Sequence, residues 1–293
     1  MEQSVAIVLG GVFHAAVLFL VAAGLQLVFG VQKILNLACG SFYALGAYFG
    51  VSAVRWALGA GVPAPLFVAV LVGSGLALSV IGPLIERILR TIYGRDESLQ
   101  LLLTFALVLM FEDVIRFFWG TAPQQLGGVY LVYGQVHLGS LTIPVYNLIV
   151  ILAGGAVAAL MGWVLARTRF GRIVRATAEN REMSEALGVD IARVYARVFT
   201  LGTALGTVGG ALVIPATAAM TGMGIELIVE AFAVVVIGGL GSMRGAFVGA
   251  LIVGVLEAVA IATYPELEML AVYAIVIAVL VLRPAGLLGK ATA

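Results

Sequence analysis

Charged side chains are scarce in this sequence. Only 16 Lys or Arg and 15 Asp or Glu occur among 293 residues, whereas 62% of the residues are hydrophobic. The mean hydropathy of +1.16 lies far above the range of a soluble domain. These values indicate an integral membrane protein. The net charge of +1, without a basic stripe, gives no reason to expect nucleic acid as a partner.

Residues that catalyse reactions or bind metals are also rare. The single cysteine, Cys39, cannot form an internal disulfide, and the two histidines, His14 and His137, are far apart in the chain. The sequence contains no HExxH, no paired-cysteine spacing, no GxSxG and no GxxxxGK[ST] phosphate loop. We therefore expect no catalytic residues, no metal site and no cofactor. If ATP is used, a separate chain must hydrolyse it.

Long apolar runs recur along the whole chain. Their lengths are close to the roughly 20 residues that a helix needs to cross the hydrocarbon core. The pattern predicts an all-α, polytopic membrane protein in which residues 1–293 form a single transmembrane domain with about eight to nine helices. The first run has no basic segment before it and is expected to be a retained span. The expected crossings are 5–30, 37–57, 64–88, 99–119, 146–166, 196–218, 226–240, 246–263 and 269–284.

The basic residues gather in every second connection between the spans, and these connections all lie on the same side of the membrane. They occur at Lys33, within 86–97 and within 167–197, whereas 120–145 contains no Lys or Arg. By the positive-inside rule, the N-terminus is expected outside the membrane and the C-terminus on the cytoplasmic side.

Two glycine-rich segments each begin a span directly after another apolar run ends. They are LNLACGSFYALGAY (35–48) and GGLGSMRGAFVGAL (238–251). Irregular backbone at membrane depth is tolerated only where it lines a cavity or is covered by protein, and broken helices in corresponding halves of a chain indicate a transport site. The two segments leave open a weak internal repeat between 5–90 and 226–284.

Few ionisable residues fall within the expected spans. Glu112 and Asp113 precede Arg116 by four and three positions, so they are expected to pair on one helix face. Glu257 is expected to be isolated, and Glu230 to border the outer surface. A proton-coupled carrier needs more ionisable residues in its interior than this, which weakens that alternative.

A polar stretch interrupts the apolar pattern at 171–197, where nine side chains are charged. Inserting them into the bilayer costs on the order of 20–30 kcal/mol, so the stretch must lie in water or against a partner. The spacing of Ile173, Ala176, Met183 and Leu187 predicts one short amphipathic helix, with Gly188 as its αL cap. One alternative is that the helix packs on the spans of its own chain or lies at the lipid headgroups. The other is that it presents Met183 and Leu187 to a groove of another protein.

Three segments in a fixed order carry a resemblance to one family. They are VFGVQKILNLACGSFYALGAYFG (28–50), RATAENREMSEALGVDIARVYARVFTLGTALGTVGGAL (175–212) and AFAVVVIGGLGSMRGAFVGALIVGVLEA (231–258), and the closing LVLRPAGLLG (280–289) extends the match. The chain resembles the LivH-like permease subunits of branched-chain amino acid ABC importers, within a group that also handles urea and other small amides or acids. One position departs from the family, which commonly has a histidine where this chain has Cys39.

The resemblance implies a heteromeric importer in a bacterial or archaeal cytoplasmic (inner) membrane. Its other parts are a second related, LivM-like permease, two ABC ATPase subunits and an extracytoplasmic solute-binding protein. The resemblance places a coupling helix within a cytoplasmic loop at about 167–195. Its ATPase-coupling residues would be Ala178, Glu179, Asn180, Met183, Ser184, Glu185, Ala186, Leu187 and Gly188. The translocation path would include Asn36, Gly40, Ser41, Gly238, Gly239, Gly241 and Ser242. A stand-alone channel or secondary carrier is the alternative function.

Overall fold

Helices form at each of the expected crossings. The computed structural model describes residues 2–126, 128–138, 141–264, 266, 268–283 and 286–289. The helices at the expected crossings are α1 (Glu2–Gln32), α2 (Ala38–Gly59), α3 (Phe67–Leu78) continued by α4 (Gly82–Leu89), α5 (Glu97–Trp119), α6 (Val145–Arg167), α9 (Ile191–Val213), α10 (Met223–Gly238), α11 (Met243–Thr263) and α12 (Glu268–Leu282). The predicted all-α membrane fold is confirmed.

Among the described residues, helix length and composition alone identify five helical segments as long and apolar enough to cross a membrane. These are Ser4–Gln32, Ala64–Ile92, Val145–Arg167, Ile191–Val213 and Met243–Thr263. The second of them joins α3 to α4 through a 3₁₀ turn at Ser79–Ile81. Pro83 lies in the first turn of α4. Proline has no N–H to donate, so the regular α-helical hydrogen bond is missing at this residue, next to the 3₁₀ turn.

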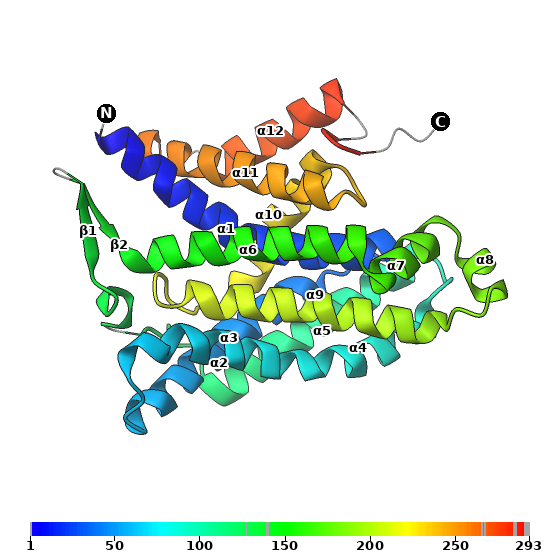
Figure 1. Ribbon diagram of the computed structural model, residues 1–293, viewed down its shortest axis with the longest axis horizontal. Coiled ribbons are helices and arrows are strands. Elements are labelled where there is room, and N and C mark those ends of the chain that lie inside the picture. The colour runs from blue at the N-terminus through cyan, green and yellow to red at the C-terminus, as the bar shows by residue number, and fades with distance from the viewer. Residues whose placement is uncertain are drawn as a thin grey trace.

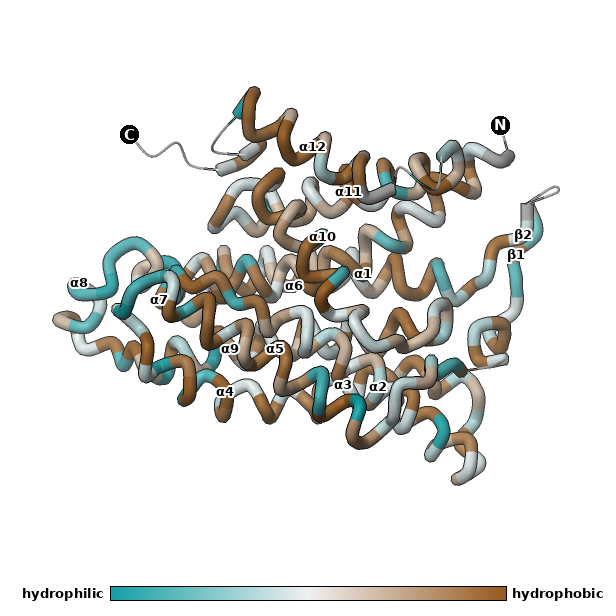
Figure 2. Tube along the Cα trace, turned by 180° about the vertical axis from the view of Figure 1, so that it is seen from behind, coloured by the Kyte–Doolittle hydropathy of each residue, from teal (hydrophilic) through white to brown (hydrophobic). Residues whose placement is uncertain are grey.

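The remaining elements lie at the two ends of the helical bundle. Figure 1 shows α6 and α9 running along the long axis, with α7 and α8 at one end and the β1–β2 hairpin at the other. Figure 2 shows that hydrophilic residues gather around α7 and α8. The elements are α7 (Arg169–Glu179), α8 (Arg181–Ala186), β1 (Gln135–Leu138), β2 (Leu141–Pro144) and the 3₁₀ turns Ala64–Leu66, Arg90–Ile92 and Val129–Leu131. The antiparallel hairpin was not predicted from the sequence.

The core lies where α1 packs antiparallel against α9 and α11. Glycines allow the backbones to approach: a Cβ atom on Gly24 would lie 2.6 Å from the Gly202 carbonyl oxygen, and one on Gly11 would lie 2.8 Å from that of Gly254. Lipid tails supply no hydrophobic drive for helices to associate, so membrane helices gain stability from such close van der Waals contact. These contacts fix α1 at the centre of the molecule, beside both glycine-rich breaks.

Candidate translocation path and coupling segment

The first break lies between α1 and α2. Helix α1 ends at Gln32, and Lys33 has a positive φ of 57°. Asn36 is buried, and its Oδ1 accepts a hydrogen bond of 3.1 Å from the backbone N–H of Ala38 at the start of α2. An asparagine side chain can satisfy a free N–H of a first helical turn, so this residue fixes where α2 begins. The predicted path residue Asn36 is therefore part of the break itself.

Helix α2 begins against the first turn of α10. A Cβ atom on Gly40 would lie 2.1 Å from the carbonyl oxygen of Gly224, and a Cβ atom on Gly224 would lie 2.6 Å from that of Gly40. The two backbones are therefore in direct contact. Beside them, Ser41 lines a small pocket together with Glu112 and Gly222. The N-terminal ends of both helices, which carry partial positive charge, border this pocket.

The second break joins α10 to α11 through two glycines in the left-handed region. Gly239 has φ 97° and Gly241 has φ 84°, values that a side chain would strain. Ser242 caps α11, because its Oγ accepts a hydrogen bond of 3.1 Å from the N–H of Gly245. The carbonyl of Gly239 accepts from Gln26 Nε2 at 2.8 Å, which ties the break to α1.

The predicted path residues fall into two groups at opposite ends of α10. Gly40 and Ser41 lie beside Gly224, whereas Gly238 packs against Gly245 at the other end. Gly224 and Gly238 are 14 positions apart in α10, which corresponds to about 21 Å at a rise of about 1.5 Å per residue. The sequence analysis missed Gly224, since nothing near it in the sequence indicates its contact with Gly40. The proposed repeat stays a prediction.

The polar stretch forms two helices, so the predicted single helix is wrong. Asn180 has φ −149° and ψ 102°, which ends α7. Its side chain then accepts a hydrogen bond of 2.9 Å from the N–H of Met183 and caps α8. The end of α8 agrees with the prediction: Gly188 has φ 84° and donates to Glu185 O, while Val189 donates to Ser184 O. This pair of bonds is a Schellman motif.

The residues of the predicted apolar stripe are exposed in both helices. Helix α7 buries Val174 and Thr177 against the ends of the spans, whereas Ile173 is 38% exposed. On α8, Met183 is 58% exposed and Leu187 is 78% exposed. Among the predicted coupling residues, Ser184 is buried and Ala178 half-buried, and the exposed ones are Glu179, Asn180, Met183, Glu185, Ala186, Leu187 and Gly188. The face of α8 is therefore uncovered by its own chain, as far as the structure describes it.

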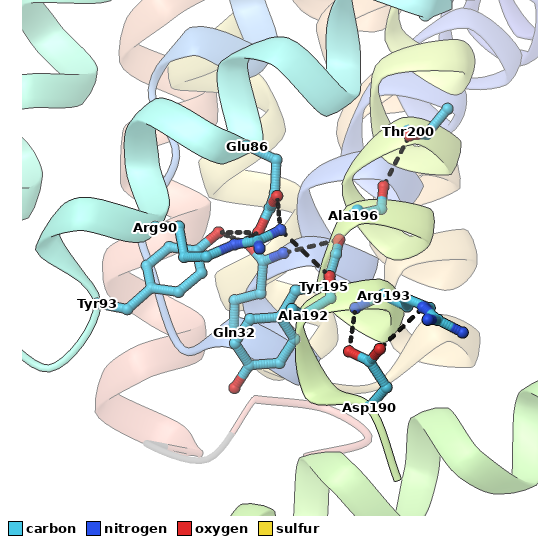
Figure 3. A network of polar contacts seen from close by, with 10 residues as sticks. All are labelled: Gln32, Glu86, Arg90, Tyr93, Asp190, Ala192, Arg193, Tyr195, Ala196 and Thr200. Carbon is cyan, nitrogen blue, oxygen red and sulfur yellow. Dashed lines mark hydrogen bonds and ion pairs between the residues drawn. The ribbon is translucent and has the colours of Figure 1, made fainter.

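A polar network, which the sequence analysis missed, connects the helices beneath α8 (Figure 3). Glu86 is fully buried and accepts a hydrogen bond of 3.0 Å from Arg90 Nε. Arg90 also donates to the carbonyl of Ala192 at the start of α9, at 3.3 Å. The network therefore ties α4 to the first turn of α9.

Tyr93 extends the network to the end of α1. Its hydroxyl lies 3.2 Å from Gln32 Oε1 and 3.4 Å from Glu86 Oε1, so its one proton serves one of them at a time. The pKa of Tyr93 is raised above its ordinary value, mainly by burial and secondly by the negative charge of Glu86. The hydroxyl therefore keeps its proton. Gln32 in turn donates to Tyr195 O at 3.1 Å, and Arg181 of α8 stacks over the Tyr195 ring at 5.7 Å.

Several acidic residues within the spans lie beside a basic side chain. Arg116 forms the predicted ion pairs, at 2.5 Å with Glu112 and 3.8 Å with Asp113. Glu257, expected to be isolated, instead lies 3.1 Å from His14 Nε2. That expectation is wrong because the two residues belong to α1 and α11, which are distant in sequence and packed together in space.

Comparison with known proteins agrees with this architecture. Residues 7–280 match the family described as branched-chain amino acid transport system / permease component. The high-affinity branched-chain amino acid transport system permease protein BraD of Pseudomonas aeruginosa is 27% identical over 280 residues, covering 92% of this chain and 91% of that protein. LivH of Salmonella typhimurium, described in the same words, is 28% identical over 96% of this chain and 94% of its own length.

A more distant relative and one solved structure are also similar. The probable branched-chain amino acid transport permease protein LivH of Methanocaldococcus jannaschii is 26% identical over 85% of this chain and 78% of that protein. PsaBC from Streptococcus pneumoniae in complex with Fab has a TM-score of 0.45 at 13% identity, covering 92% of this chain and 89% of that one. From the family match, this chain belongs to the permease components of branched-chain amino acid transport systems, and it is a multi-pass membrane protein that transports rather than an enzyme.

Proposed function

We propose that this permease component forms half of the solute path of an ATP-driven importer and transmits the action of separate ATPases to it. Its partners are a second, LivM-like permease, two ABC ATPase subunits and an extracytoplasmic solute-binding protein. The substrate class is branched-chain amino acids or a related small polar solute, a proposal supported by the similarity to branched-chain amino acid permease proteins. ATP is used by the partner subunits, and we expect no cofactor in the solute path or the coupling segment of this chain.

The exposed apolar pair on α8 is the observation that carries the coupling role. Met183 and Leu187 are exposed at the end of the molecule where hydrophilic residues gather (Figure 2). A six-residue helix is marginal alone, so a groove in another protein is a suitable environment for its apolar face. Through Arg181 and Tyr195, a force on α8 would reach the ends of α1 and α9.

The junction of α2 and α10 supports the path role. The two helices touch in their first turns, at Gly40 and Gly224, and their N-terminal ends border the pocket that Ser41 lines. Helix N-termini inside the membrane favour anionic groups, such as the carboxylate of an amino acid. The second break, at Gly239 and Gly241, lies at the other end of α10, where a rearrangement of that helix would open or close the path.

The charge distribution supports an orientation in the cytoplasmic membrane of a bacterium or archaeon. The α7–α8 end carries most of the basic residues and would face the cytoplasm, where ATP is present. The hairpin and the N-terminus would then lie outside, on the side of the solute-binding protein. The C-terminus would lie in the cytoplasm.

Copurification tests the coupling role. Met183→Asp or Leu187→Asp places a charge on the apolar face and is expected to abolish copurification of the ATPases while the permease still inserts. Leu131→Asp is the matched control, because Leu131 is 51% exposed at the opposite end of the molecule. Unchanged copurification of both α8 variants, or equal loss in the control, would exclude α8 as the contact.

Reconstitution distinguishes the importer from a stand-alone channel or secondary carrier. Liposomes that contain the whole complex are expected to take up a branched-chain amino acid only with ATP. Transport by the lone chain without ATP would instead establish the alternative. Substitution of Gly239 or Gly241 by Leu is expected to change uptake, since both have positive φ. Normal uptake kinetics in both variants would remove the second break from the path.

A further inference from the structure

Three ionisable side chains from three helices meet within the membrane-spanning region. His14 of α1 lies 3.1 Å, through Nε2, from Oε2 of Glu230 on α10 and 3.1 Å from Oε2 of Glu257 on α11. All three ligand atoms lie within 4.8 Å of one another. Figures 1 and 2 show that α10 and α11 lie close together beside α1. Ionisable residues at this depth are costly and usually functional, yet neither the path nor the coupling segment uses these three.

One acceptor in the cluster lacks a donor. Glu257 is only 6% exposed, and its Oε2 has no hydrogen-bond partner among the described residues. The short contact with His14 does not supply one, because the hydrogen bond of Nε2 goes to Glu230. A buried carboxylate oxygen without a donor is expensive, so its position calls for a positively charged ligand.

We infer that His14, Glu230 and Glu257 bind a divalent transition-metal ion of the Zn²⁺ class. One imidazole nitrogen and two carboxylate oxygens are ligands of the type such ions accept. Ligands at about 2.0 Å from a tetrahedral ion lie about 3.3 Å from one another, close to the two measured contacts of 3.1 Å. The ion replaces the proton on Nε2 and draws the three atoms around itself.

Charge balance favours a divalent ion over a proton. With both carboxylates ionised, a protonated His14 leaves the cluster with a charge of −1, whereas a neutral His14 with a divalent cation brings it to zero. Neutrality matters here, because an uncompensated charge at the centre of a membrane helix is costly. The ion therefore stabilises the contact between α1, α10 and α11.

Two cavities border the cluster. One of about 410 Å³ is lined by Glu230, Glu257 and Tyr273, and one of about 430 Å³ is lined by His14 and Glu257. Glu257 lines both cavities. Either cavity has room beside this carboxylate for a further ligand of the ion.

Metal titration of the full chain in nanodiscs tests the site. After treatment with a chelator, calorimetry with Zn²⁺ is expected to show one saturable site per chain. His14→Gln and Glu257→Gln are each expected to weaken binding at least 100-fold. The matched controls are His137→Gln, at the other histidine, and Glu226→Gln, in the same cavity as Glu230. Both controls are expected to bind as the wild type does.

The wild type alone also decides the question, even if a variant fails to fold. Zinc X-ray absorption at less than one equivalent is expected to show nitrogen and oxygen ligands at about 2.0–2.1 Å with the scattering pattern of one imidazole. Absence of saturable binding, a sulfur ligand from Cys39, or equal loss in His137→Gln would overturn the inference. Each of these results is independent of whether the chain transports amino acids.

Discussion

Adding one methyl group to Gly40 directly tests the contact between α2 and α10. The Cβ atom of Gly40→Ala would lie 2.1 Å from the Gly224 carbonyl oxygen, whereas ordinary contact begins at 3.4 Å. The two helices must therefore separate by about 1.3 Å at this point, the difference between those distances. No side-chain rotation can relieve the clash, since the opposing atom belongs to the backbone.

The expected cost follows from two opposing terms. Overpacking of a well-packed core costs about 1–3 kcal/mol, and exchange of glycine for alanine in a helix returns up to about 1 kcal/mol. The net destabilisation is therefore on the order of 1–2 kcal/mol. For a chain of this size, that corresponds to a decrease of roughly 2–3 °C in the apparent melting temperature.

The assay is thermal unfolding of the purified protein followed by tryptophan fluorescence. Gly73→Ala in α3 is the matched control, because a Cβ atom there meets nothing within 4 Å. In Gly73→Ala the gain in helix propensity is not opposed by a clash, so this variant is expected to have a slightly higher melting temperature. If Gly40→Ala were as stable as Gly73→Ala, the close approach of Gly40 to Gly224 would be refuted.

Three further predictions concern the cytoplasmic network, the capping of α8 and the orientation. Arg90→Met leaves the buried Glu86 carboxylate without its partner and should cost roughly 1–3 kcal/mol, measured by thermal unfolding; an unchanged melting temperature would contradict the pairing. Asn180→Ala removes the cap of α8, worth about 1 kcal/mol, so amide exchange there should accelerate about fivefold, and unchanged exchange would exclude the cap. A membrane-impermeant thiol reagent on intact cells should label His137→Cys but not Leu187→Cys, and the reverse pattern would invert the orientation; buried Cys39 gives little background.

Local properties of the sequence were enough to predict the helices. Apolar length fixes where a helix can cross the bilayer, and the αL cap at Gly188 depends only on its neighbours. The number of charged side chains is also a local property, and it excluded 171–197 from the bilayer. The break at Asn180 was not predicted, because the choice of two helices over one depends on its side chain bonding to the N–H of Met183.

Contacts between distant segments were decided only by the tertiary structure. Gly40 meets Gly224, and His14 meets Glu230 and Glu257, because α1, α2, α10 and α11 pack together through small residues. Hydropathy gives each helix its length but not its rotation or its neighbours, since lipid and apolar side chains are equally suitable surroundings for a membrane helix. Close backbone packing sets those neighbours, and so it determined where the isolated polar residues of the sequence came together.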